Sequence, residues 1–112
     1  MIYETYPGQE DLAVFLHRPP FVPVRYKHLK RGTFYTVISD NEYHLSTFSE
    51  EGTLHEFPWQ GRMVMCTFQF SGDGSKSKYA GPIVIYVGDD GKFWIRPKFE
   101  FHDGRFEKVE EA

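Results

Sequence analysis

Short runs of apolar residues separated by turn-forming residues dominate the chain from about residue 24 onward. The clearest pair covers 82–87 and 92–96, which flank the sequence Gly88-Asp-Asp-Gly. Two β-prone runs around such a turn predict a β-hairpin. We expect its second strand to end at Pro97, because proline has no amide hydrogen to donate to a sheet.

Further strands are predicted on both sides of this hairpin. The extended segment 21–25 contains Pro23, which suits a strand at a sheet edge or a segment leading into the sheet. The run 62–70 is almost continuously apolar, which predicts a central strand buried on both faces. Weaker patterns predict strands at 33–39, 43–48 and 105–109, turns at Asp40-Asn41 and Glu50-Glu51-Gly52, and an ambiguous stretch at 54–59.

One short helix is predicted over 9–17, where Leu12, Phe15 and Leu16 share a face. Pro19 and Pro20 end it. A helix of about two turns is unstable alone, so we expect it to dock on the sheet.

These elements predict a mainly β protein, a small, partly open SH3-like or OB-like barrel with one short N-terminal helix. The 112 residues suit a single domain over 1–112 with core strands within 24–109. The chain holds 11 Phe, 7 Tyr and 2 Trp, which suit either a β core or a contact surface. The net charge of −3 argues against a general nucleic-acid binder.

The single cysteine, Cys66, excludes an intrachain disulfide and lies in an apolar run, so we expect a buried thiol. No apolar stretch approaches the roughly 20 residues of a membrane span. The first residues lack the basic and apolar regions of a signal peptide. We therefore expect a soluble, cytoplasmic protein.

Several short motifs occur in a characteristic order along the chain. They are Tyr26-Lys-His-Leu-Lys-Arg-Gly, Tyr35-x-Val-Ile, Val84-Ile-Tyr, Trp94-x-Arg-Pro, and Phe101 followed by Gly104-Arg-Phe. Over residues 25–108 the chain thereby resembles a family of small uncharacterised bacterial and phage- or prophage-borne proteins. The resemblance implies a small β-rich domain, often encoded on mobile elements, and it implies no particular activity.

The first candidate binding site is a basic cluster with an interleaved tyrosine and histidine, namely Arg25, Tyr26, Lys27, His28, Lys30 and Arg31. Such residues can follow phosphates and stack on a base. Because alternate residues of a strand face opposite sides, only half of the cluster can contact one ligand. The alternative is a charged edge strand that resists pairing with other sheets.

Two further groups are candidates for ligand contacts. Lys76 and Lys78 lie in a Gly- and Ser-containing stretch that either binds phosphate or forms an exposed hairpin loop. Arg96 and Arg105, with Trp94, could clamp a carboxylate or phosphate. Alternatively, Trp94 belongs to the core and Arg96 pairs with Asp103. Trp59 is predicted to be an exposed contact aromatic.

Catalytic patterns find little support in the sequence. The five histidines have no metal-binding spacing, and no serine or cysteine nucleophile is placed beside the pair His102-Asp103. The acidic pairs Glu50-Glu51 and Asp89-Asp90 lack the spacing of a calcium loop. We expect no cofactor and no metal, and we rank a small hydrolase or nuclease last.

The favoured function is a non-enzymatic accessory protein of the phage or mobile-element type. It would bind a host protein or a small anionic, nucleotide-like ligand, and so inhibit a host enzyme or counter a defence system. The alternative is a small-barrel nucleic-acid-binding protein. The aromatic content is also compatible with a homodimer.

Overall fold

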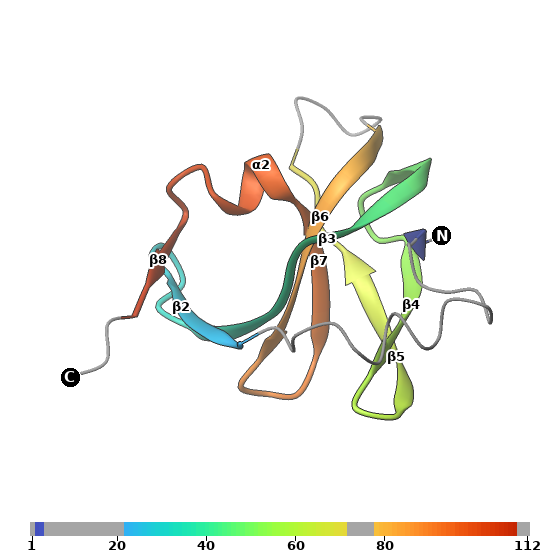
Figure 1. Cartoon of the computed structure of the whole chain (residues 1–112). Helices are drawn as coiled ribbons and strands as arrows, with labels where there is room; N and C mark the ends of the chain where they lie inside the picture. Colours follow the sequence, from blue (N-terminus) through green and yellow to red (C-terminus); the bar gives the residue numbers. More distant parts are fainter. Residues whose placement is uncertain (1, 4–21, 72–77, 110–112) are drawn as a thin grey trace.

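A computed structural model describes residues 2–3, 22–71 and 78–109 (Figure 1). The predicted helix at 9–17 and the candidate Lys76 lie outside these described residues. The elements are β1 (Ile2–Tyr3), β2 (Val24–His28), β3 (Phe34–Glu50), β4 (Leu54–Trp59), β5 (Arg62–Phe68), β6 (Lys78–Gly88), β7 (Phe93–Pro97), α2 (Lys98–Phe101) and β8 (Phe106–Lys108).

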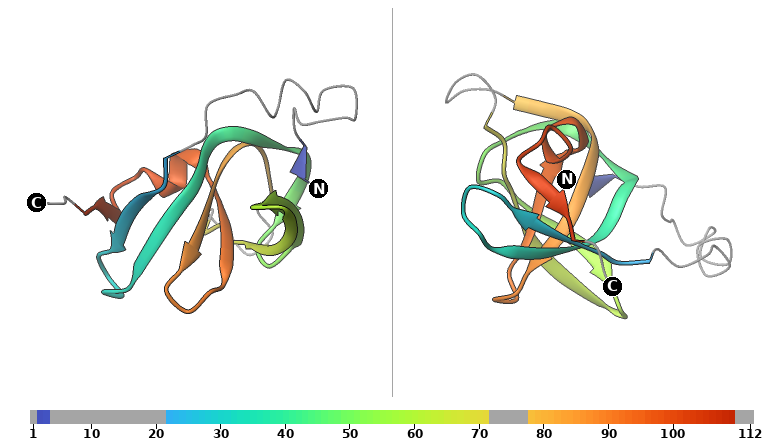
Figure 2. Two further views of the ribbon diagram at one scale, coloured as in Figure 1. Left: turned by 60° about the horizontal axis from the view of Figure 1, so that its bottom comes forward. Right: turned by 90° about the vertical axis from the view of Figure 1, so that its left-hand side faces the viewer.

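The strands form one sheet, so the predicted mainly β class is confirmed. Their order is β4-β5-β7-β6-β3-β2-β8, with β1 paired to β3, and the path does not close on itself. All pairs are antiparallel except β5 with β7. Figure 2 shows how strongly the sheet twists and curves, so that β2 and β8 turn away from β4 and β5.

The predicted hairpin is confirmed as β6 and β7, with Ile85 opposite Ile95. The Gly88 amide donates to the Lys92 carbonyl at 2.9 Å. Gly91 takes a positive φ of 87°, which a residue with a side chain rarely adopts. The second strand ends at Pro97, as its missing amide hydrogen predicts.

The turn predicted at Asp40-Asn41 is wrong, because β3 continues through these residues to Glu50. The pairing of β3 with β6 shifts register between Asp40 and Tyr43, where Asn41 has a φ of 71°. Asparagine tolerates this left-handed conformation better than most residues. The same preference that predicted a turn here therefore produces a shift in strand register. The strand bends without reversing direction.

Two predictions about strand positions are also wrong. The segment 62–70 is buried on one face only, since Met63 and Met65 are 54% and 51% exposed while Val64 and Cys66 are buried. The strand that is buried on both faces is β6. The alternative of a charged edge strand for the basic cluster is wrong too, because β8 pairs with β2 through Tyr26, Lys27 and His28.

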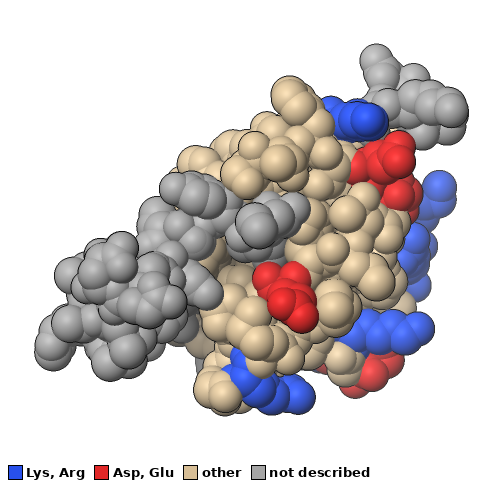
Figure 3. Space-filling view, turned by 90° about the vertical axis from the view of Figure 1, so that its right-hand side faces the viewer, with Lys and Arg blue, Asp and Glu red and all other residues tan. Residues whose placement is uncertain are grey.

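Alternate residues of β6 contribute to two separate hydrophobic cores. Ile83 and Ile85 belong to the larger core, whereas Val84 and Tyr86 face the smaller one, which Phe101 helps to complete. The surface at the β4 and β5 end of the molecule is mostly uncharged (Figure 3).

Cys66 is fully buried, as predicted. Burial raises the pKa of its thiol to about 12, because a thiolate would lose its hydration there. The side chain therefore acts as a small hydrophobic group of the larger core.

The buried imidazole of His55 should make the stability of the protein depend on pH. Its imidazole is buried beside Ser49, with 3.1 Å between His55 Nε2 and Ser49 Oγ, and burial lowers its pKa from 6.5 to about 4. In the unfolded chain the His55 imidazole therefore binds a proton below pH 6.5, whereas in the folded chain it binds one only below about pH 4. We expect the free energy of unfolding to fall by about 2–3 kcal/mol between these pH values.

Urea denaturation at a series of pH values measures this contribution. His55→Gln should flatten the slope between pH 6.5 and pH 4, whereas the control His44→Gln, at an exposed position, should keep it. Equal slopes in His55→Gln and the parent protein would contradict the assignment.

Candidate functional site

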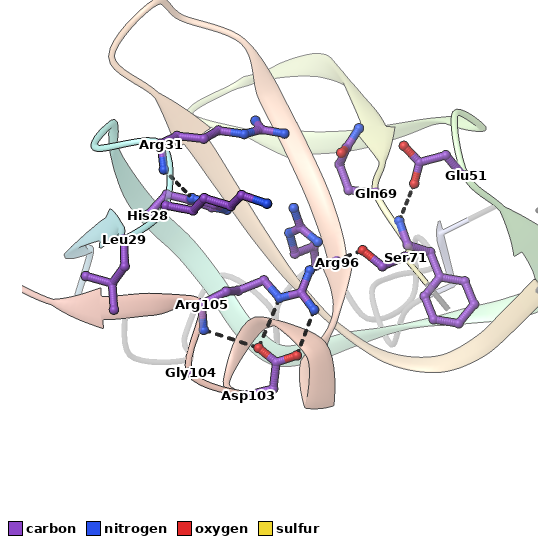
Figure 4. A pocket seen from close by; sticks show the side chains of 12 residues that line it. His28, Leu29, Arg31, Glu51, Gln69, Ser71, Arg96, Asp103, Gly104 and Arg105 are labelled. Carbon is purple, nitrogen blue, oxygen red and sulfur yellow. Dashed lines mark hydrogen bonds and ion pairs between the residues drawn. The ribbon is translucent and has the colours of Figure 1, made fainter. Parts of the chain in front are cut away.

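A groove of about 1080 Å³ lies between the β2–β3 turn, the end of β5, the end of β7 and the turn from α2 to β8 (Figure 4). We call it the cationic groove, after the lysine and arginines that line it. Its lining consists of His28, Leu29, Lys30, Arg31, Glu51, Gln69, Phe70, Ser71, Arg96, Asp103, Gly104 and Arg105.

Local sequence features bring the walls of the groove together. Pro97 ends β7 and is followed by the single helical turn α2. Gly104, with a φ of 108°, then lets the chain turn back toward the sheet. The strand β8 pairs with β2, and the Leu29 amide donates to the Arg105 carbonyl at 3.0 Å. One wall is thereby tied to the other.

Arg96 lies at the base of the cationic groove and is 5% exposed. Its Nε donates a hydrogen bond to the Tyr86 hydroxyl at 2.8 Å, and its guanidinium lies 5.5 Å from the centre of the Phe106 ring. Figure 4 shows it in the middle of the lining residues. Its Nη1 is engaged by the neighbouring carboxylate of Glu100, so the guanidinium is held from both ends.

Glu100 lies between the two arginines and is 3% exposed. Its Oε1 is 3.5 Å from Arg96 Nη1, and its Oε2 is 3.4 Å from Arg105 Nη1. The Ser71 amide donates to Glu100 Oε2 at 2.9 Å. The carboxylate thus holds both guanidinium groups and the end of the β5 segment in place.

The predicted ion pair between Arg96 and Asp103 is wrong. Asp103 instead pairs with Arg105, whose Nε and Nη2 donate to its two carboxylate oxygens at 3.0 and 2.9 Å. This contact lowers the pKa of Asp103, chiefly through the hydrogen bond from Arg105. Sequence reasoning missed Glu100, because Arg96 lies in β7 and Glu100 in α2, so no helical spacing linked the two residues.

The pKa of His28 is sensitive to the charges that line the cationic groove. Its Nδ1 accepts a hydrogen bond from the Arg31 amide at 3.1 Å, which places the ring proton of neutral His28 on Nε2. Its pKa is lowered first by burial and then by Arg31, Arg96, Arg105 and Lys30. Each of these cations disfavours a further positive charge at this position, so the local field is positive.

The basic cluster predicted from sequence is divided between two faces, as strand alternation requires. Arg25 turns away from the groove and pairs with Asp89, at 2.8 Å between Nη2 and Oδ2. Lys27 lies over the ring of Phe34, and Tyr26 packs edge-on against Phe101. His28, Lys30 and Arg31 therefore line the cationic groove, whereas Arg25, Tyr26 and Lys27 do not.

The remaining candidates also separate. Trp59 is half-buried against Phe93, with 5.3 Å between ring centres, so the prediction of a freely exposed aromatic is wrong. Trp94 is half-buried beside the smaller core. Lys78 is exposed at the start of β6 and is not among the lining residues.

Other chemistry has little structural basis in the described part of the chain. No three His, Cys, Asp or Glu side chains gather there as metal ligands would. Its helical residues form no segment with the length and apolar character needed to cross a bilayer. His102 contacts Asp40 at 3.1 Å and not its neighbour Asp103.

No family model, curated protein or solved structure matches the chain. The resemblance to phage-borne proteins therefore stays a prediction. Three of its motifs nevertheless meet at the cationic groove. The first contributes His28 to Arg31, Trp94-x-Arg-Pro contributes Arg96, and Gly104-Arg-Phe contributes Gly104 and Arg105.

Proposed function

We propose that this protein is a non-enzymatic binding protein whose cationic groove takes a small anionic ligand. The observation that carries the proposal is the convergence of Lys30, Arg31, Arg96 and Arg105 on one groove. Their combined positive field attracts an anion, and the groove is large enough for a small molecule.

The division of charge among the lining residues supports this proposal. Arg105 is engaged by Asp103 and Glu100, so it serves mainly to shape the wall. Arg96 is held rigidly by Tyr86 and Glu100 at the base of the groove, where its fixed charge adds to the positive field. Lys30 and Arg31 lie at the exposed rim, where their charges steer and hold an incoming anion.

Two finer predictions from the sequence belong to the same proposal. The first is an SH3-like or OB-like form for this open, curved sheet. The second is an accessory role on a mobile element, in which the protein sequesters a small anion or binds a host protein. Ligand binding in the cationic groove would be the physical means of such a role.

Replacing Arg31 with alanine tests the proposed function. We expect affinity for pyrophosphate, measured by isothermal titration calorimetry at low salt, to fall by about tenfold, because a charge-assisted contact contributes about 1.5 kcal/mol. The unfolding free energy should barely change, since the side chain is exposed.

Arg62→Ala is the matched control, because it removes an exposed arginine outside the cationic groove. It should leave pyrophosphate affinity unchanged. Equal losses in the two variants would indicate a nonspecific charge effect, and no binding to the parent protein would refute the proposal.

A further inference from the structure

We infer that the anionic ligand of the cationic groove carries an aromatic ring, as a mononucleotide does, and that this ring stacks on Trp94. The inference rests on the proposed function and names the chemical class of the ligand. It depends on Arg31, which lines both the cationic groove and a second hollow beside Trp94.

Trp94 and Arg96 are two residues apart on β7, so their side chains leave the same face of the sheet. The opposite positions on β6 are Tyr86 and Val84, which both belong to the smaller core. Trp94 therefore lies on the same side of the sheet as the base of the cationic groove.

A second hollow lies beside Trp94 and shares Arg31 with the cationic groove. It has a volume of about 480 Å³, and Arg31 lines both hollows. Its other lining residues are Thr33, Phe34, Tyr35, Gly88, Asp89, Asp90, Lys92 and Trp94. A space lined by His28, Arg31, Trp94 and Arg96, among others, has a volume of only about 10 Å³, which is room for no more than a water molecule. A ligand whose anionic group binds Arg31 can instead place a ring in the second hollow beside Trp94.

The aromatic rings around Trp94 are already committed to one another. Tyr35 packs edge-on against Tyr86 at 5.4 Å and against Phe106 at 5.8 Å between ring centres. Within the described residues, no ring contact of this kind involves Trp94, and its indole is half-buried beside the second hollow. A large π surface that is held in place but lacks a ring partner is suited to stacking on a base.

Carboxylates in both hollows limit the length of the ligand. Glu51 lines the cationic groove, and Asp90 lines the second hollow beside Asp89, which is paired with Arg25. A phosphate chain that extended along both hollows would meet Glu51 and Asp90 and be repelled. The pattern therefore favours one nucleotide over a nucleic-acid strand, which needs an extended basic track.

Calorimetry with two probes tests the inference. AMP carries a base, and ribose 5-phosphate has the same sugar phosphate without it. We expect the parent protein to bind AMP about 10- to 100-fold more tightly, which is the usual contribution of one stacked base. Trp94→Leu keeps an apolar side chain and should reduce AMP affinity to that of ribose 5-phosphate, whose own affinity stays unchanged.

Indole fluorescence provides a measurement that does not depend on Trp94→Leu folding. The chain has 2 tryptophans, so Trp59→Phe leaves Trp94 as the single reporter. AMP should quench its emission, and ribose 5-phosphate should leave it unchanged. Quenching by neither probe, despite measurable AMP binding, would overturn the stacking arrangement.

The outcomes separate this inference from the proposed function. Equal affinities of the parent protein for AMP and ribose 5-phosphate would overturn the inference and leave the proposed function standing. Failure of both probes and of pyrophosphate to bind would refute both. An oligonucleotide that binds more tightly with each added phosphate would also overturn the inference, in favour of a nucleic-acid strand.

Discussion

Glu100→Ala is expected to lower the free energy of unfolding by about 3–5 kcal/mol, because it leaves two arginines without their shared carboxylate. Arg96 would remain buried, and the Ser71 amide would lose its acceptor. A buried charge without a counterion costs far more than the net contribution of the intact ion pair. Urea denaturation of the parent protein and the variant measures the loss.

Two comparisons identify the cause of that loss. Glu107→Ala removes an exposed carboxylate from β8 and should change the unfolding free energy by less than about 0.5 kcal/mol. Glu100→Gln keeps an acceptor for the Ser71 amide but removes the charge, so we expect an intermediate loss. If Glu100→Ala is no more destabilising than Glu107→Ala, the carboxylate does not hold the arginines as described.

Local patterns along the chain predicted much of the fold, because turns and alternation act over a few residues. The hairpin of β6 and β7 is the clearest case, since its turn and Pro97 mark both ends of the second strand. The continuous path of β3 through Asn41 was not predictable in this way. Its long pairing with β6 overrides the local preference for a turn, and that pairing is formed by distant residues.

Predictions of burial failed where they depended on the neighbours of a strand. The apolar run of β5 includes Met63 and Met65, which face outward because no further layer covers that side within the described residues. Composition alone cannot distinguish such a strand from one buried on both faces. By contrast, β6 has a hydrophobic core on each side because the sheet curves around it.

The candidate site was predicted in its parts but not in its assembly. Alternation along β2 correctly separated Arg25 and Lys27 from His28. The meeting of His28, Arg96 and Arg105 depends on β8 pairing with β2, which joins residues 78 to 82 positions apart in the chain. The role of Glu100 as the shared counterion follows from the same pairing and from the short helix after Pro97.

Phe101→Ala should cost about 3–5 kcal/mol of unfolding free energy, the usual loss for removing a buried aromatic ring. Phe101 is completely buried and stacks on Phe106, with 4.2 Å between ring centres, and it also packs against Tyr26 and Tyr86. These contacts hold α2 and β8 against the sheet, so the variant should also bind pyrophosphate more weakly than the parent protein. Urea denaturation and calorimetry measure the two effects.

Phe99→Ala is the matched control from the same helical turn. Phe99 is 61% exposed, so its loss should cost about 1 kcal/mol or less and leave pyrophosphate affinity unchanged. Similar losses of stability in the two variants would show that the smaller core does not depend on Phe101. A destabilised Phe101→Ala protein with full affinity would show instead that the groove keeps its shape without this support, and that Glu100 and the pairing of β8 with β2 position its arginines.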